Sequence, residues 1–323
     1  MADQLAKYAG VEIGEMGAWI AITFGAADGP LSRWRARFTT APAIDEIVTR
    51  IADGLRELRA GAEIAAIGVA VWDTQKPTRG ASSIVGVDAA ELAARLEVLT
   101  GAPTRVQGAI EAAAQAEAHM GAGQDADPLV YIHLGREVRD AIVSHGRALH
   151  GAHSQGGQTG HWRVAERGPR CSCGQVGHLN PLCSSQGFVR LAIGAIAQDE
   201  VALAAANAAT GGRVETITAR QVIALARERP AALEPLIAEA ARALSVALAN
   251  LTLLIDPTVI VLGGPLGAAG GAFLEQVQEG VSERLRAVAA GWRAPAIEPA
   301  RLEPHSALTG AWLLACAPGS ESA

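Results

Sequence analysis

The stretch GGQTGHWRVAERGPRCSCGQVGHLNPLCS, residues 156–184, is the most informative part of this 323-residue chain. It places three of the four cysteines beside two histidines, among glycines that permit tight turns. In a reducing compartment such clustering is typical of metal binding rather than of disulfides. Structural zinc takes four thiolate or imidazole ligands. The pattern therefore predicts a zinc site made by His161, Cys171, Cys173 and His178.

Two alternatives stay open for this loop, whose bounds we take as residues 157–184. Cys183 lies five residues after His178 and is a second candidate for the fourth ligand. The loop could also have lost its metal and kept only small and polar residues. If zinc is bound, we expect it to act structurally, because metal binding to such a loop stabilises its local fold.

Outward from the loop, strand and helix patterns alternate along the chain. Residues 43–59 carry apolar side chains at helical spacing, whereas residues 65–72 and 129–134 form short apolar runs typical of buried strands. This alternation predicts an α/β fold with mainly parallel sheets. The polar, glycine-rich segment 121–128 divides the chain into two predicted lobes. We place the first at residues 1–122, joined by a C-terminal helix at about 305–318, and the second at residues 123–304.

Composition excludes several classes of protein. A net charge of −6 and a pI of about 5.8 argue against a basic nucleic-acid-binding face. We see no apolar run close to the roughly 20 residues that span a bilayer, and no signal-peptide pattern at the start. The expected compartment is therefore the cytoplasm, and no membrane partner is expected.

Four collinear stretches carry a resemblance to a known family, and they are residues 82–117, 156–184, 250–267 and 302–315. Together they resemble the ROK family of repressors, open reading frames and sugar kinases. The resemblance implies a two-lobe, ribonuclease-H-like and actin-like sugar kinase fold. It further implies phosphorylation of hexoses or N-acetyl-hexosamines with ATP and magnesium, or sensing of such sugars by transcription factors. In the family pattern the position of His178 is normally a third cysteine, so one zinc ligand has been exchanged for another.

The residue that would act as catalytic base is missing. The family has an Asn-Asp pair where a strand ends and a helix begins, and this pair falls on Gly108 and Ala109. A methyl group cannot accept the proton of a sugar hydroxyl, and general-base assistance contributes roughly 10²–10⁴-fold to such a reaction. Glu111 lies about 200° around the helix from Ala109, so we expect its side chain to point elsewhere.

The predicted phosphate turns have also changed. The family's Asp-x-Gly-Gly-Thr reads Glu12-Ile13-Gly14-Glu15-Met16, which adds a negative charge where a triphosphate would approach. Its Gly-Thr-Gly aligns with Leu134-Gly135-Arg136-Glu137, which brings in two charges. These changes argue against ATP and magnesium as cofactors. The glycine pair Gly263-Gly264 is retained, either as a weak nucleotide contact or simply as a tight turn.

The predicted sugar contacts keep their polarity and lose their charge. The family's two glutamates become Gln158 and Asn180, beside His161. The family's sugar-binding asparagine region reads Gly-Ala-Ser-Ser at residues 80–83, so that amide is expected to be absent. Acid-to-amide changes preserve hydrogen bonding, which indicates a cleft that still binds a neutral polar molecule.

These observations favour a pseudokinase, meaning a sugar- or metabolite-binding regulatory protein without phosphoryl transfer. A repurposed enzyme acting on a sugar-like or natural-product substrate is an alternative, and a weak ATP-dependent sugar kinase with a displaced base is another. The resemblance implies a homodimer. A protein partner is conceivable, whereas direct nucleic-acid binding is not expected, because the first strand begins near residue 8 and leaves no room for a helix-turn-helix domain.

Overall fold

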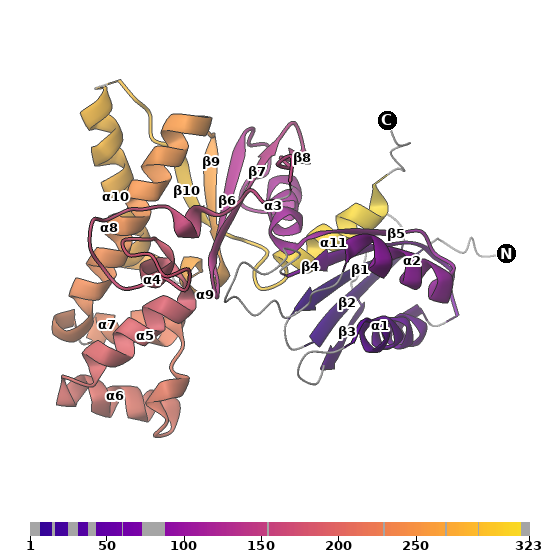
Figure 1. Ribbon diagram of the computed structural model, residues 1–323, viewed down its shortest axis with the longest axis horizontal. Helices are drawn as coiled ribbons and strands as arrows, with labels where there is room; N and C mark the ends of the chain where they lie inside the picture. Colours follow the sequence, from indigo (N-terminus) through magenta and orange to yellow (C-terminus); the bar gives the residue numbers. More distant parts are fainter. Residues whose placement is uncertain are drawn as a thin grey trace. The chain divides into compact units, whose positions relative to one another are not determined.

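The structure is a computed structural model, and it describes residues 7–14, 17–24, 32–37, 43–59, 61–72, 88–153, 155–228, 230–268, 270–289 and 291–317. The altered positions Glu15 and Met16 and the predicted sugar-contact region 80–83 lie outside the described residues. The chain divides into two compact units (Figure 1). Unit 1 comprises Met1–Ala116 and Pro304–Ala323, and unit 2 comprises Glu117–Glu303. The chain thus changes unit after residue 116, where the sequence placed the boundary after residue 122.

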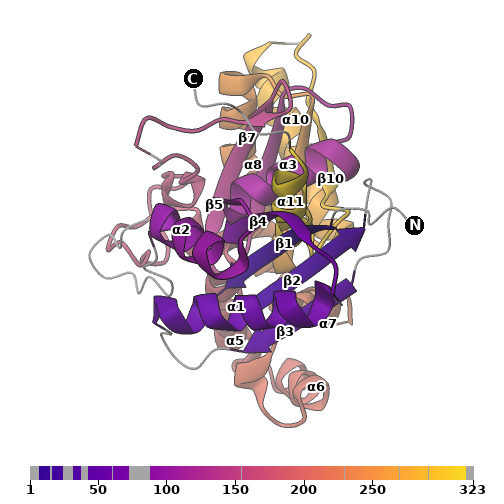
Figure 2. The same ribbon diagram turned by 90° about the vertical axis from the view of Figure 1, so that its right-hand side faces the viewer.

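Unit 1 is a five-stranded sheet in the order β3-β2-β1-β4-β5 with helices on both faces. Its strands are β1 Lys7–Gly14, β2 Gly17–Phe24, β3 Ser32–Arg37, β4 Ile64–Val71 and β5 Thr104–Gly108. Its helices are α1 Ile44–Arg59, α2 Ala89–Thr100, α11 Ser306–Cys316 and α3 Ala109–Met120, whose last turn belongs to unit 2. Figure 2 shows α1 lying along this sheet.

Alternation of side chains decides which helix covers which face of this sheet. Val11 and Val69 point into the apolar core that α1 and α2 close. Their strand neighbours Gly10 and Gly68 face α11 instead, and a Cβ on Gly10 would lie 2.7 Å from the backbone nitrogen of Trp312. The glycines therefore allow α11 to pack directly against the backbone of β1 and β4.

Unit 2 repeats the same strand plan in the order β10-β9-β6-β7-β8. Its strands are β6 Leu129–Leu134, β7 Val138–Ser144, β8 Arg147–Ala148, β9 Val259–Gly263 and β10 Ala296–Pro299. Its helices are η1 Thr159–His161, α4 Asn180–Cys183, α5 Ser185–Ile196, α6 Glu200–Thr210, η2 Val214–Thr216, α7 Ala219–Glu228, α8 Pro230–Ile255, α9 Gly264–Gly267 and α10 Gly271–Val288.

The sheets are mixed, and the expectation of mainly parallel sheets is wrong. In unit 1 the first three strands form an antiparallel meander, and β4 and β5 then add in parallel to β1. In unit 2, β6, β7 and β8 form the meander, and β9 and β10 add in parallel. Short turns join antiparallel neighbours, whereas parallel neighbours need a longer crossover, usually through a helix. Each sheet uses both kinds of connection and therefore contains both antiparallel and parallel pairs.

Helix α8 forms the centre of the unit 2 core. It is the one helix among the described residues that is long and apolar enough, by length and composition, to cross a membrane. Within its span Ala231–Ile255, 67% of the most apolar 18-residue window is buried inside the protein. The expectation that no apolar run approaches membrane-spanning length is therefore corrected, and packing against α10, α7 and α5 explains the composition.

Candidate metal centre and ligand site

The predicted zinc ligands converge in unit 2. His161 ends the short helix η1, and two antiparallel bridges, Arg163 with His178 and Arg170 with Val176, fold the following loop back on itself. Within the described residues, the ligand atoms of His161, Cys171, Cys173 and His178 all lie within 4.8 Å of one another. The predicted four-residue set is therefore brought together.

The distances in this cluster suit a single zinc ion. The Sγ atom of Cys171 lies 3.6 Å from Nδ1 of His161, and the Sγ atom of Cys173 lies 3.3 Å from Nδ1 of His178. Two ligand atoms on one tetrahedral zinc are about 3.5 Å apart. The donor set, two sulfurs and two imidazole nitrogens, is one that structural zinc sites use.

The pKa values of His178 and Cys171 indicate how metal binding by this cluster would depend on pH. Burial, together with the charges of His161 and Arg163, lowers the pKa of His178, which favours the neutral imidazole that a metal needs. Burial raises the pKa of Cys171, so without a metal this thiol stays protonated. Metal binding would therefore release a thiol proton, and affinity would fall in acid.

Cys183 is excluded as a member of this cluster. Its side chain is fully buried and its thiol donates a hydrogen bond to the carbonyl oxygen of Ala240, at 3.2 Å, in helix α8. Burial raises the pKa of this thiol strongly, so Cys183 is an inert core residue. Of the two candidates for the fourth position, His178 is the one that the fold brings to the others.

The two predicted sugar-contact amides differ in their surroundings. Asn180 is 6% exposed, and its Oδ1 accepts the backbone N–H of Val138 at 2.6 Å, which holds the start of β7. Gln158 is only half-buried, and it immediately precedes η1, which carries His161. The amide oxygen of Asn180 is thus used by the protein, whereas Gln158 stands beside the candidate metal ligand.

The predicted glycine turn at the end of β9 has a packing explanation. Gly264 has φ +79°, and a Cβ there would lie 2.7 Å from the carbonyl carbon of Leu134. Its N–H donates to Oε1 of Glu303 at 2.7 Å. The tight-turn alternative therefore accounts for this glycine, and its amide already has an acceptor inside unit 2.

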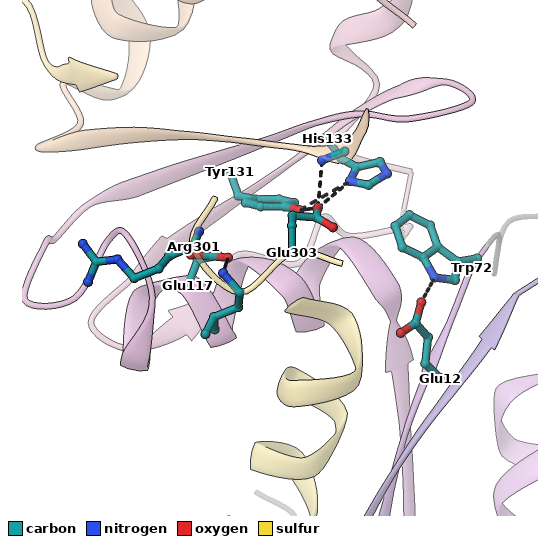
Figure 3. Close-up of polar contacts among 9 residues, drawn as sticks. Glu12, Trp72, Glu117, Tyr131, His133, Arg301 and Glu303 are labelled. Carbon is teal, nitrogen blue, oxygen red and sulfur yellow. Dashed lines mark hydrogen bonds and ion pairs between the residues drawn. The ribbon is translucent and has the colours of Figure 1, made fainter. Parts of the chain in front are cut away.

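Glu303 is the centre of a polar group that sequence reasoning missed. Besides Gly264, its Oε1 accepts the hydroxyl of Tyr131 at 3.0 Å and lies 3.6 Å from Nδ1 of His133 (Figure 3). Burial alone would raise the pKa of Glu303, but the hydrogen bonds from His133, Gly264 and Tyr131 and the charge of His133 hold it below its usual range. In the sequence, Glu303 is marked only by the proline that follows it, and this feature alone does not predict a polar site.

Glu117 was also missed, and its role is structural. Its side chain is fully buried, and its carboxylate accepts backbone N–H groups from Ala122, Arg301 and Leu302 at 2.8–3.1 Å (Figure 3). Three backbone donors compensate the cost of burying the charge. Glu117 thereby ties the end of α3 to the segment that follows β10.

In unit 1, the first phosphate turn carries a contact that the sequence did not suggest. The indole N–H of Trp72, just after β4, donates to Oε1 of Glu12 on β1 at 2.6 Å (Figure 3). Glu12, which the sequence analysis aligned with the aspartate of the family's phosphate turn, is 9% exposed. One oxygen of the Glu12 carboxylate therefore already accepts a hydrogen bond from a bulky side chain.

The start of α3 corrects one expectation. Ala109, which the sequence analysis aligned with the family's catalytic aspartate, is 2% exposed. Glu111 does not turn away from this end of the helix: its carboxylate lies over Gly108, the residue next to Ala109. The helical-wheel argument failed because helical side chains lean toward the N-terminus and because Gly108 leaves its own side-chain space empty.

Comparison with known proteins identifies the family. The ROK family model matches residues 8–317. The chain belongs to the ROK family. This ROK protein is 31% identical to a glucokinase of Halalkalibacterium halodurans over 57% of its own length and 56% of that protein, so this match spans less than two thirds of that relative. It is 28% identical to an N-acetylmannosamine kinase of Salmonella arizonae over 85% of this chain and 86% of the other.

A solved structure supports the same fold. A ROK family glucokinase of Streptomyces griseus, in complex with glucose and AMPPNP, superposes with a TM-score of 0.75 at 25% identity and covers 96% of this chain and 99% of that one. The predicted ROK sugar kinase fold is thus confirmed. In the ROK protein described here, unit 2 also contains a pocket of about 210 Å³ between α7, α8 and α10, lined by Ile223, Ala226, Arg227, Glu234, Ile237, Ala272, Phe273 and Gln276.

Proposed function

We propose that this ROK protein binds a sugar through a zinc-stabilised loop and does not transfer phosphate to it. It is a pseudokinase, with a sensing or regulatory role. The observation that supports the proposal most is that Ala109, which the family resemblance aligns with the catalytic aspartate, offers only a buried methyl group. No general base at that position means no assistance to attack on a phosphoryl group.

The two phosphate turns support the same proposal. Glu12 already holds the indole N–H of Trp72, and Glu137 pairs with Arg139 at 3.1 Å in the second turn. Carboxylates at these places repel the phosphates of ATP unless a cation lies between them. The Gly264 amide, a third candidate contact for a nucleotide, is bound by Glu303. ATP and magnesium are therefore not part of the proposed function.

The sugar side retains the means to bind a ligand. Gln158 immediately precedes η1 and His161 ends it, and the four proposed zinc ligands would hold that loop in one conformation. Asn180 supports the site indirectly, through its bond to Val138. We assign zinc a structural role, because all four positions of a tetrahedral site are filled by protein side chains.

The test compares binding with turnover on zinc-loaded protein. Glucose and N-acetylmannosamine are offered in a calorimetric or thermal-shift experiment, and the same samples are assayed for ADP release with ATP and magnesium. We expect stabilisation by at least one sugar and no ADP above a no-enzyme blank. Sugar-dependent ADP release at a constant level through successive purification steps would contradict the proposal.

One observation favours a second candidate function, a weak sugar kinase with a displaced base. The carboxylate of Glu111 lies beside the position of the missing aspartate, over Gly108. In that case, ADP release would occur and would be lost when Glu111 is replaced. The changed phosphate turns are the reason that this candidate is placed second.

A further inference from the structure

The two cysteines of the Cys/His cluster lie on one tight turn of unit 2. Cys171 and Cys173 are separated by a single serine, and the N–H of Gly174 donates to the carbonyl oxygen of Cys171 at 2.9 Å. The N–H of Cys171 donates in turn to the carbonyl oxygen of Gln175 at 2.8 Å. Both bonds join backbone atoms of the loop itself, so they hold the two thiols together independently of a metal.

The geometry of this turn permits a covalent bond between the two sulfurs. The Sγ atoms of Cys171 and Cys173 lie within 4.8 Å of each other. Cα atoms two residues apart are separated by at most about 7 Å, and a disulfide spans Cα atoms roughly 4.4–6.8 Å apart. Rotation of the side chains within the turn can therefore close the gap between the sulfurs.

Exposure directs an oxidant to this pair and away from the other thiols. Of the four cysteines, Cys173 is the exposed one, and Cys171 beside it is buried. Cys183 is fully buried and donates its thiol hydrogen to helix α8, whereas Cys316 belongs to α11 of the other unit. Since the oxidation of thiols follows their accessibility, Cys173 is the sulfur that a small oxidant meets first.

We propose that Cys171 and Cys173 are a site of reversible oxidation, at which peroxide joins the two thiols in a disulfide and the loop loses its metal. The inference rests on the zinc-bound loop of the proposed function and adds a redox control of that loop. It requires neither sugar binding nor the absence of phosphoryl transfer. Transient disulfides of this kind are typical of redox sensing in reducing compartments.

The reaction needs one molecule of hydrogen peroxide and two protons. The thiolate of Cys173 attacks one peroxide oxygen, the O–O bond breaks, and hydroxide leaves a sulfenic acid on Cys173. The thiolate of Cys171 then attacks that sulfur, the S–S bond forms, and the S–O bond breaks with loss of a second hydroxide. Two protons from solvent convert both hydroxides to water. The two sulfurs give up two electrons in total, and the peroxide accepts them.

The disulfide removes half of the donor set. A disulfide has no thiolate to offer, so His161 and His178 remain, whereas a structural zinc site uses four ligands. The resemblance implies a third cysteine in place of His178, and such a cysteine would keep one thiolate in the cluster after oxidation. With His178, oxidation of one pair consumes every thiolate of the cluster, and a thiol reductant restores both.

The experiment exposes the zinc-loaded full chain to equimolar hydrogen peroxide. Released zinc is measured with a chromogenic chelator. Free thiols are then alkylated in denaturant, and the tryptic peptide of residues 171–190, which contains three of the four cysteines, is analysed by mass spectrometry. We expect one zinc ion released for each peroxide consumed, a disulfide between Cys171 and Cys173, and one alkyl group on Cys183. Dithiothreitol with added zinc should restore the zinc content.

Two variants separate the disulfide from other effects of peroxide. C173H keeps four possible zinc ligands, because imidazole can replace thiolate, and it removes one of the two thiols. It should bind zinc and retain it under the same exposure. C316A is the matched control, because it removes a cysteine outside the cluster, and it should release zinc as the wild type does. If C173H holds no zinc, the disulfide mapping and zinc release of the wild type decide alone.

The outcomes distinguish this inference from the proposed function. Zinc retained by the wild type in excess peroxide, a disulfide that includes Cys183, or equal zinc loss from C173H overturns the inference and leaves the zinc-bound loop in place. A wild-type chain that binds no zinc refutes both. Failure of glucose and N-acetylmannosamine to bind refutes the proposed function alone, and the disulfide with its matching zinc release then still stands.

Discussion

The Cys/His loop of unit 2 and the strand ends of unit 1 both differ from the pattern that the family resemblance implies, with opposite results. In the loop, where the resemblance implies a cysteine in place of His178, the four ligand atoms lie within 4.8 Å of one another. At the end of β5, where the resemblance implies an Asn-Asp pair in place of Gly108 and Ala109, the carboxylate of Glu111 lies over Gly108.

The difference follows from what each site requires. A structural zinc needs four electron pairs directed at one point, and sulfur or nitrogen can supply each of them. A general base needs one carboxylate at hydrogen-bond distance from one particular hydroxyl. Exchange of ligands therefore preserves the first kind of site, whereas exchange of the base ends the second kind or changes its use.

The largest effect that tests this comparison is removal of a metal ligand. C171A should abolish zinc binding and lower the Tm by roughly 10 °C, because metal binding contributes directly to the stability of the loop. Zinc content by atomic absorption and melting by calorimetry measure both effects. Treatment of the wild type with a strong chelator should reproduce the lower Tm.

The matched control removes Cys183, the cysteine of this region that lies outside the metal cluster. C183A should keep its zinc and lose about 1–2 kcal/mol of unfolding free energy, because it deletes a buried thiol that donates to Ala240. Zinc retained by C171A, or lost by C183A, would show that the ligand set is wrong.

The next prediction compares Asn180, which we expect to stabilise the site, with Gln158, which we expect to contact the ligand. N180A should lower the unfolding free energy by about 2 kcal/mol, because it leaves the buried N–H of Val138 without an acceptor. Q158A should weaken sugar binding and should cost less stability than N180A, because Gln158 is only half-buried. Denaturant unfolding and calorimetry on both variants measure this, and equal stability losses would argue that Gln158 is also a structural residue.

A pH effect is expected from Glu303. Its pKa in the folded protein lies below the ordinary value of 4.5, so its charge stabilises the fold above that pH and ceases to do so as the pH falls through the folded pKa. E303Q should therefore cost about 1–2 kcal/mol at pH 7, and the cost should shrink as the pH falls below 4.5 and through the lower pKa of the folded protein. Unfolding curves from pH 3 to 7 measure it, and a cost that is constant with pH would mean that the charge does not matter.

The smallest effect tests whether Trp72 closes the first phosphate turn. W72F removes the bond to Glu12 and should cost about 1 kcal/mol. If the lost base is the decisive change, W72F should remain inactive with ATP and magnesium. ADP release by W72F in a coupled assay would show instead that the tryptophan was the main obstacle, and the contrast between the two regions would then need revision.

The sequence alone determined the elements and the chemistry available to them. Helical periodicity located α1, and two short apolar runs located β4 and β6. The four residues of the Cys/His cluster were likewise predicted from the sequence, because their residue types and short spacings are visible there.

Tertiary structure alone decided which groups meet. The partners of Glu303 lie on separate strands and turns, Asn180 serves β7, Cys183 faces α8, and Trp72 reaches Glu12 from another strand. Even Glu111, three residues from Gly108, was misplaced by a helical wheel, because its direction depends on the empty space at a glycine. Such contacts depend on packing between distant segments and on side-chain direction, which no local pattern encodes.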